Sequence, residues 1–322
     1  MWKTFAVFSD IHANILALNA CCEKIKIWEN DWQQSIPIYI NGDSLDAGPC
    51  PLETIDAIEK MSNVFILGNH EDYLKEYILN KSHKKFSDPL WRFIPWTVEK
   101  IGEARLLRFV EKCQFRYSTD DGFLTLLHAS PETHSKVVQE LEAPEKRISH
   151  LPFQKSCKIS RLFIVGHSHF SGIHENLNLK HTWINGGSVG YSFQNKGPSS
   201  NPWASFVVGR YRHEANEIYE LEVHIDTVDY DVQKLIASYI DSGALTACAP
   251  YSVAILSQCI FNQDIVFKMF KEARKSGITQ PQLPQFMIQH LKNIGVLDRL
   301  KSELCKYGHK ISFENSISEF GP

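Results

Sequence analysis

Residues 4–14 read TFAVFSDIHAN, and this stretch decides the fold. Its first six residues, from Thr4 to Ser9, form an apolar run with β-branched and aromatic side chains, which is typical of a buried strand. Asp10 and His12 follow directly. Asn14 then provides an N-cap for a helix. We therefore predict a strand, a polar turn and a helix in immediate succession.

The same order recurs farther along the chain. Residues 36–41 form a second apolar run that ends at Gly42-Asp43, and residues 64–67 form a third that ends at Gly68-Asn69-His70. A helix from 51 to 60 is predicted between them. Strands joined by helical crossovers are parallel, with the helices on the outside of the sheet. Because ligands gather at the carboxyl ends of such strands, the three polar turns should lie along one rim.

A second β-rich stretch follows the same rule. Residues 122–127 lead into His128, and residues 162–165 lead into Gly166-His167-Ser168-His169. Two histidines at i and i+2 after a strand are a common arrangement of metal ligands. Three further strands and one helix are predicted after them, at 182–185, 205–209, 218–225 and 231–242.

Two segments carry no motif for chemistry. Residues 73–112 have a helical pattern with an aromatic cluster of Trp91, Phe93 and Trp96. Contact between this insert and the core is a better explanation of the cluster than stacking on a nucleobase. Residues from 249 to about 307 also have apolar positions near helical spacing. We interpret this segment as a cover for an edge of the fold, or alternatively as a surface for a partner.

Composition excludes several classes of protein. The chain has 322 residues, 43% hydrophobic and 22% charged, with a net charge of -3, which indicates a globular protein with a sizeable core. No apolar run approaches the roughly 18 residues that span a bilayer. The first residues lead into a strand rather than a secretion signal. With eight scattered cysteines, this pattern predicts a cytoplasmic protein in a reducing compartment.

Seven side chains at the strand ends carry nitrogen and oxygen donors suited to divalent metals: Asp10, His12, Asp43, Asn69, His128, His167 and His169. Taken singly, each has an ordinary explanation as a helix N-terminal acid, a turn residue or a buried histidine. Their order, each following a strand, favours a dinuclear centre instead. Imidazole, carboxylate and amide ligands suit manganese first, with iron, zinc or nickel as alternatives. Two such ions lie about 3.5–4 Å apart.

In this order of motifs the chain resembles the calcineurin-like metallophosphoesterase superfamily. It is most similar to the small prokaryotic branch whose first motif reads SDIHGN, represented here by SDIHAN at residues 9–14. LHASP at 127–131 and NGGSVG at 185–190 also agree with that branch. The resemblance covers roughly residues 1–242. It implies an α/β fold (α+β in some schemes), a four-layer α-β-β-α sandwich of two mixed sheets.

The resemblance also implies the organisation of the chain. Residues 1–243 would form the metallophosphoesterase catalytic domain, with 73–112 as a cap-like helical insert. Residues 244–322 would form a helical C-terminal extension.

The resemblance implies a role for each candidate residue. Asp43 would bridge two metals, and the hydroxide between the metals would attack the phosphoester. His70 would be the catalytic acid, or would stabilise the phosphoryl oxygens as a cation. Glu71 would orient the imidazole or raise its pKa, or would be an ordinary first-turn acid of a helix. One metal would be held by Asp10, His12 and His169, and the other by Asn69, His128 and His167.

The implied reaction is hydrolysis of a phosphodiester or phosphomonoester of a small, nucleotide-like substrate. Asp46-Ala47-Gly48 departs from the phosphoprotein phosphatases, which have Arg in place of Ala47, and this departure disfavours their substrates and symmetrical dinucleotide tetraphosphates. Two alternatives are a non-catalytic protein-binding scaffold and a nuclease of the DNA-repair type. The complete ligand set disfavours the scaffold. The slightly acidic composition disfavours nucleic acid as the substrate.

Overall fold

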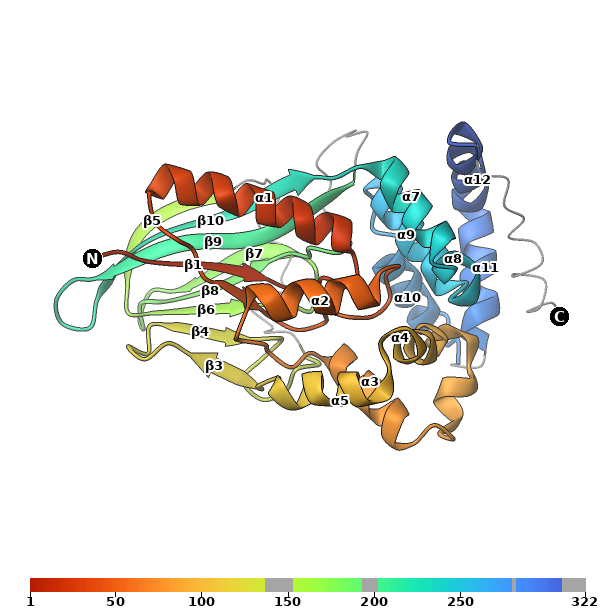
Figure 1. Cartoon of the computed structure of the whole chain (residues 1–322), viewed down its shortest axis with the longest axis horizontal. Coiled ribbons are helices and arrows are strands. Elements are labelled where there is room, and N and C mark those ends of the chain that lie inside the picture. The colour runs from red at the N-terminus through yellow and green to blue at the C-terminus, as the bar shows by residue number, and fades with distance from the viewer. Residues whose placement is uncertain (137–152, 193–201, 280–281, 309–322) are drawn as a thin grey trace.

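The computed structural model describes residues 1–136, 153–192, 202–279 and 282–308. Two mixed β-sheets lie face to face, flanked by helices, and a group of C-terminal helices stands at one end of the sheets (Figure 1). The α/β sandwich predicted from the sequence is therefore confirmed. Among the described helices, none combines the length and the apolar character needed to cross a membrane.

The first sheet is built around the N-terminal strand. Its strand order is β2-β1-β9-β10-β5. β1 is parallel to β2 and antiparallel to β9, while β10 is antiparallel to both β9 and β5. The strands are β1 (Lys3–Phe8), β2 (Ile38–Ile40), β5 (Phe153–Ile159), β9 (Trp203–His213) and β10 (Tyr219–Asp229).

The second sheet has the order β3-β4-β6-β8-β7. Its three central strands β4, β6 and β8 are parallel, and both edge strands are antiparallel to their neighbours. The carboxyl ends of β4 and β6 therefore point to the same edge. The strands are β3 (Arg116–Ser118), β4 (Leu124–Leu127), β6 (Arg161–Val165), β7 (Ser171–Asn176) and β8 (His181–Gly186).

The space between the sheets is filled by one apolar cluster. Phe5 and Val7 of β1 and Val223 of β10 meet Leu126 of β4 and Ile164 of β6 in it, all buried. Helices α1 (Ile15–Trp32) and α2 (Pro51–Met61) lie on the outer side of the first sheet. β10 alternates buried and partly exposed residues from Tyr219 to Val223, whereas residues 223–226 are all buried, since α1 contacts this strand on the outer side of the sheet.

The predicted third strand at residues 64–67 does not form a regular ladder. Phe65 makes an isolated parallel bridge to Ile40, and Ile66 makes another to Gln114. The segment is extended, but Phe65 pairs with one neighbouring segment and Ile66 pairs with the other. A continuous ladder with either neighbour is therefore not formed. The segment still delivers the following Gly68-Asn69-His70 turn to the rim.

The insert after this turn is helical, as predicted. It contains α3 (Asn69–Leu79), two short 3-10 turns (Lys84–Ser87 and Pro89–Trp91), α4 (Phe93–Ile101) and α5 (Glu103–Lys112). Phe93 is buried, and its ring stacks on Tyr251 of the C-terminal helices at 5.0 Å between centroids. The aromatic cluster thus packs against the core and the C-terminal helices.

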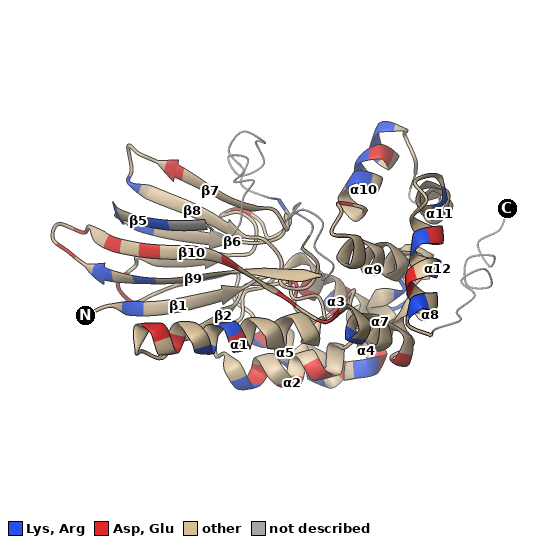
Figure 2. Ribbon diagram, turned by 90° about the horizontal axis from the view of Figure 1, so that it is seen from above, with Lys and Arg blue, Asp and Glu red and all other residues tan. Residues whose placement is uncertain are grey.

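The C-terminal helices share an apolar core with the first sheet. The buried residues of α9 belong to the same hydrophobic cluster as Leu18 of α1 and Ile94 of α4. α9 carries no charged residue, whereas α10 and α12 show charged side chains (Figure 2). Residues 309–322 of the predicted extension lie outside the described residues. The helices are α7 (Val232–Asp241), α8 (Ala244–Ala247), α9 (Tyr251–Phe261), α10 (Val266–Lys275), α11 (Leu283–Asn293) and α12 (Val296–Lys306).

Candidate metal centre

Five loops bring the predicted ligands together at one end of the two sheets. Asn14 caps α1 by accepting a hydrogen bond from the Ala17 N–H, so the chain turns directly from β1 into the helix and leaves Asp10 and His12 at the rim. Donor atoms within 4.8 Å of one another form three overlapping groups: Asp10, His12 and His169; His12, Asp43 and His70; Asp43, His128 and His167. Asp43 belongs to the second and the third of these groups, so its carboxylate connects them.

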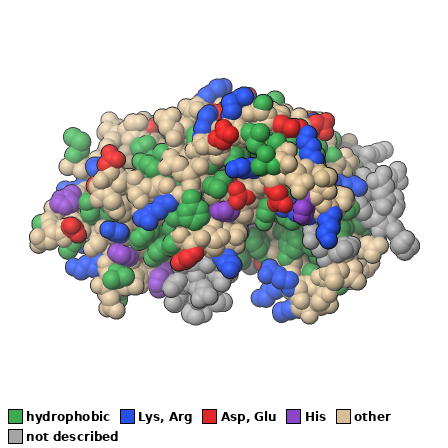
Figure 3. Space-filling view, turned by 90° about the horizontal axis from the view of Figure 1, so that it is seen from below, with side chains coloured by type: hydrophobic (Ala, Val, Ile, Leu, Met, Phe, Trp, Pro, Cys, Tyr) green, Lys and Arg blue, Asp and Glu red, His purple; other side chains and the backbone are tan. Residues whose placement is uncertain are grey.

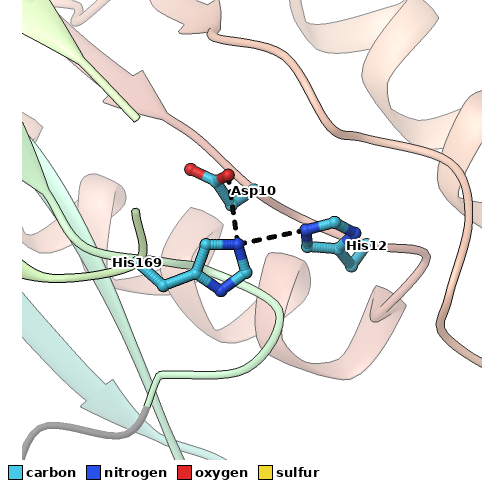
Figure 4. Close-up of side chains that lie close together, drawn as sticks. All are labelled: Asp10, His12 and His169. Carbon is cyan, nitrogen blue, oxygen red and sulfur yellow. Dashed lines mark hydrogen bonds and ion pairs between the residues drawn. The ribbon is translucent and has the colours of Figure 1, made fainter. Parts of the chain in front are cut away.

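The first group is shown in Figure 4. The Nε2 atom of His169 lies 3.2 Å from Oδ1 of Asp10 and 3.2 Å from Nε2 of His12. All three side chains are buried. Two imidazole nitrogens and a carboxylate oxygen thus point at one another in a site closed to solvent, which is the arrangement expected around a shared cation.

His128 shows the same feature in the third group, with Asp43 and His167. Its Nδ1–H donates to the carbonyl of Asn41 at 2.8 Å, so the lone pair of neutral His128 is on Nε2. That atom lies 3.1 Å from Oδ2 of Asp43. Two acceptors at this distance need a proton or a metal between them. A backbone carbonyl behind a metal-binding imidazole is the usual support for such a ligand.

Unpartnered polar atoms also lie among the predicted ligands. The Asn69 Oδ1 and His167 Nδ1 atoms are buried and have no hydrogen-bond partner among the described residues. An orphaned buried polar atom costs free energy unless a ligand satisfies it. The donor set of imidazole, carboxylate and amide oxygen fits divalent transition metals. The residues present therefore suit a dinuclear centre.

The charges of the cluster depend strongly on one another. Although burial raises the pKa of Asp43, the neighbouring His128 and His70 hold it well below its usual range. Burial lowers the pKa of His128, but Asp43 and then Asp10 outweigh burial and raise it to about 10. Burial and the charge of His128 lower the pKa of His167 to about 4. The carboxylates are therefore anionic and attract cations into this pocket.

The backbone of the loops is strained at the candidate ligands. Five of them adopt positive φ angles: Asp10 (56°), His12 (46°), Asp43 (51°), His167 (67°) and His169 (57°). For residues other than glycine, such conformations cost about 1–3 kcal/mol each and persist where the surrounding structure enforces them. This strain turns side chains that follow different strands toward a common centre.

The glycines of the motifs are required by close packing. Gly42 has a φ of 84°, and a Cβ atom there would collide with the His128 ring. A Cβ atom at Gly166 would collide with Ser9 and with the Asp10 carboxylate. Each Gly-Asp or Gly-His pair thus places a backbone against a neighbouring ligand, which only glycine permits.

Glu71 connects two of the loops. Its carboxylate accepts hydrogen bonds from the backbone N–H groups of Asp43 (2.9 Å), Ser44 (2.8 Å) and Gly68 (3.0 Å). Burial and the nearby Asp43 raise the pKa of Glu71 to about 7. Glu71 lies in the first turn of α3, as one of the two predicted alternatives has it, and its bond to the Gly68 N–H closes a capping box at the start of that helix. Its charge also adds, after Asp46 and Asp43, to the rise in the pKa of His70. In the described structure its hydrogen bonds go to backbone N–H groups, so its carboxylate also supports the backbone around Asp43.

His70 lies at the edge of the cluster, facing a cleft, and is paired with Asp46. Its Nδ1 is 2.7 Å from Oδ1 of Asp46, and its Nε2 is 3.9 Å from Oδ2 of Asp43. Burial lowers the pKa of His70, but the two aspartates outweigh burial and raise it to about 9. Asp46 was not among the predicted site residues. An acid three positions after Asp43, GDSLD, was the available signal.

A cleft of about 1220 Å³ opens beside the cluster. One wall carries Asp43, Asn69, His70 and the loop of His167 and His169. The cleft is also lined by residues of α10, in the C-terminal segment that carries no sequence motif for chemistry. The α10 residues lining the cleft are Val266, Phe267, Phe270 and Arg274.

The fold and the donor cluster are those of a metallophosphoesterase. A model of the calcineurin-like phosphoesterase family matches residues 3–171, and the chain belongs to that family. Among solved structures, a metallophosphoesterase from Sphaerobacter thermophilus is 20% identical, with 78% of this chain and 99% of that chain covered and a TM-score of 0.49. A hypothetical protein from Pyrococcus horikoshii OT3 is also 20% identical, with 79% and 97% covered and a TM-score of 0.53. No curated protein matches the sequence.

Proposed function

We propose that the protein is a dinuclear metal-dependent phosphoesterase that hydrolyses a phosphodiester or phosphomonoester of a small, nucleotide-like substrate. One observation carries the proposal: donor side chains from five loops meet around Asp43, and a charged histidine faces the adjoining cleft. Neither packing nor solubility requires such a set of mutually repelling and orphaned polar groups.

The proposed ligands divide between two ions, with manganese preferred. When bound, the ions supply positive charge for the phosphoryl oxygens and lower the pKa of water. Asp43 would be shared because its carboxylate groups with His12 and His70 on one side and with His128 and His167 on the other. The remaining ligands would be Asp10, His12 and His169 for one ion, and Asn69, His128 and His167 for the other.

His70 is proposed as the general acid. Asp46 accepts from Nδ1–H, which directs Nε2–H toward the cleft. With a pKa raised to about 9, the ring carries a proton at neutral pH and can donate it to the leaving oxygen. Glu71 would keep Asp43 in place during the reaction through its bonds to the backbone.

A small substrate is favoured over duplex nucleic acid. The net charge is -3, and on the face seen in Figure 3 basic and acidic side chains are interspersed. A nucleic-acid surface would instead gather basic residues in one patch or stripe. We also propose a cytoplasmic location, supported by eight cysteines that are all free thiols.

The test is hydrolysis of bis-p-nitrophenyl phosphate and p-nitrophenyl phosphate by purified protein with manganese, and again after chelation. Metal-dependent release of nitrophenol from either ester is expected. Cleavage of the diester would select phosphodiesterase chemistry, and cleavage of the monoester alone would select a phosphatase. Bound metal without turnover of either ester or of nucleotide esters would refute the enzyme and favour the scaffold. Nicking of supercoiled plasmid would favour the nuclease.

A further inference from the structure

One face of helix α10 lines the cleft, and the neighbouring face is buried in the core. Phe267, Phe270 and Arg274 follow the spacing i, i+3 and i+7, which places them on one side of a helix, and all three line the cleft. The residues on the adjacent face are buried in the core, which fixes the rotation of the helix. These buried residues are Val266, Met269 and Ala273.

The cleft face begins directly beside the metal cluster. The ring of Phe267 contacts the ring of His169 edge-on, with centroids 5.5 Å apart. Phe170, in the loop before β7, and Trp183 of β8 line the same cleft and are partly exposed. The ring of Trp183 stacks on the ring of Phe163, with centroids 4.1 Å apart. The cleft therefore carries partly exposed aromatic rings beside the metal cluster, and nucleobases stack on such rings with little regard to sequence.

A positive charge lies farther along the same face. Arg274 is exposed and follows Phe267 by seven residues, which corresponds to about 10 Å along a helix. Among the described residues that line the cleft, Lys136 and Arg274 are the lysine and arginine side chains. Glu132, which also lines the cleft, accepts a hydrogen bond from the Ser130 hydroxyl. A guanidinium with this exposure is suited to a phosphate or carboxylate.

We infer that α10 selects the substrate: Phe267 receives a nucleobase of the group esterified at the metals, and Arg274 binds a second phosphate on that group. The favoured substrate class is therefore a nucleotide diester with a further terminal phosphate. Both residues are specificity determinants rather than catalytic residues. The inference rests on the proposed phosphoesterase function, and it assigns a role to a segment beyond the match to the family.

The experiment compares two dinucleotides that differ by one phosphate. ApA has only the internucleotide diester, and pApA adds a 5′-terminal phosphate. We expect the wild-type protein with manganese to have a kcat/KM about tenfold or more higher for pApA, since a charged hydrogen bond is worth at least that factor. Arg274→Gln should bring the ratio close to one. Lys271→Gln removes the same charge from an exposed position of α10 that does not line the cleft, and should keep the wild-type ratio.

The aromatic part is tested by Phe267→Leu, which keeps an apolar side chain but removes the ring face. We expect kcat/KM for both dinucleotides to fall about tenfold, mainly through KM, because one base loses its stacking partner. Phe286→Leu on α11, away from the cleft, is the control and should leave both values unchanged. Thermal unfolding of each variant checks that the fold is retained.

The outcomes separate the two proposals. Cleavage of nitrophenyl esters without cleavage of ApA or pApA overturns the inference and leaves the phosphoesterase intact. An unchanged pApA-to-ApA ratio in Arg274→Gln, or a wild-type ratio near one, also overturns it. If no phosphoester of any kind is hydrolysed with any metal, the proposed function itself fails, and the inference fails with it.

Discussion

The support that Glu71 gives to the metal loops leads to a large predicted effect on stability. The side chain is 1% exposed, and its two carboxylate oxygens accept three backbone N–H groups. Glu71→Ala leaves these donors without partners in a buried place. Each such donor costs about 1–3 kcal/mol, so the expected loss is about 3–9 kcal/mol in the free energy of unfolding. Native domains have only about 5–15 kcal/mol in total, so the variant should be partly unfolded.

The matched control for this prediction is Glu53→Ala. Glu53 is an exposed acid in the first turn of α2, and its interaction with the helix dipole is worth about 0.3–1 kcal/mol. Urea unfolding of both variants should be measured at pH 8, where Glu71 with its pKa of about 7 is ionised. A chelator should be present so that metal binding does not contribute. A loss below about 1 kcal/mol in Glu71→Ala, equal to that of the control, would refute the reasoning.

Three further predictions concern the site. Asp46→Asn should lower the pKa of His70 from about 9, because the partner charge that opposes burial is lost. Turnover should then fall at pH 8 and recover toward pH 6, with metal retained. An equal loss of turnover at both pH values would contradict the role of Asp46. In the metal-free protein His128 has a pKa of about 10 and is protonated at neutral pH, so metal must displace a proton. Affinity should therefore rise with pH, about tenfold per unit for one displaced proton, and calorimetry in buffers of different ionisation enthalpy should detect that proton. Gly42→Ala should cost about 1–3 kcal/mol of stability, because the added Cβ collides with His128. The control Gly122→Ala, also at positive φ but in open space, should cost less. Equal losses of stability in the two variants would show that the collision is unimportant.

The sequence could predict the metal cluster because its signals are local. Asp10 and Asp43 directly follow short apolar strands, and parallel strands bring their carboxyl ends to one edge. In the described structure six of the predicted ligands lie in the donor groups, and Asn69 lines the adjoining cleft with Asp43; their role as ligands stays a prediction. Edge strands were harder to predict. β5 and β7 were missed because an edge strand pairs on one side only, and its sequence need not be uniformly apolar.

Other features depend on tertiary contacts that no local pattern encodes. Asp46 has the sequence of an ordinary turn residue, and its role appears only when α3 carries His70 to within 2.7 Å. Phe267 and Met269 both fit the apolar spacing of a packed helix. Which of them faces the cleft is decided by how α10 docks on the core, and this docking involves residues far apart in the chain.

The most direct test of the dinuclear centre is elemental analysis of manganese-loaded, gel-filtered protein together with its turnover. The wild-type protein and His70→Ala should each retain close to two equivalents of metal. Asp43→Asn should retain much less, because the two donor groups that contain Asp43 each lose a carboxylate. His70→Ala should lose about 10²–10⁴-fold in turnover despite its metal. If the wild-type protein retains no metal under any loading condition, the central claim is wrong.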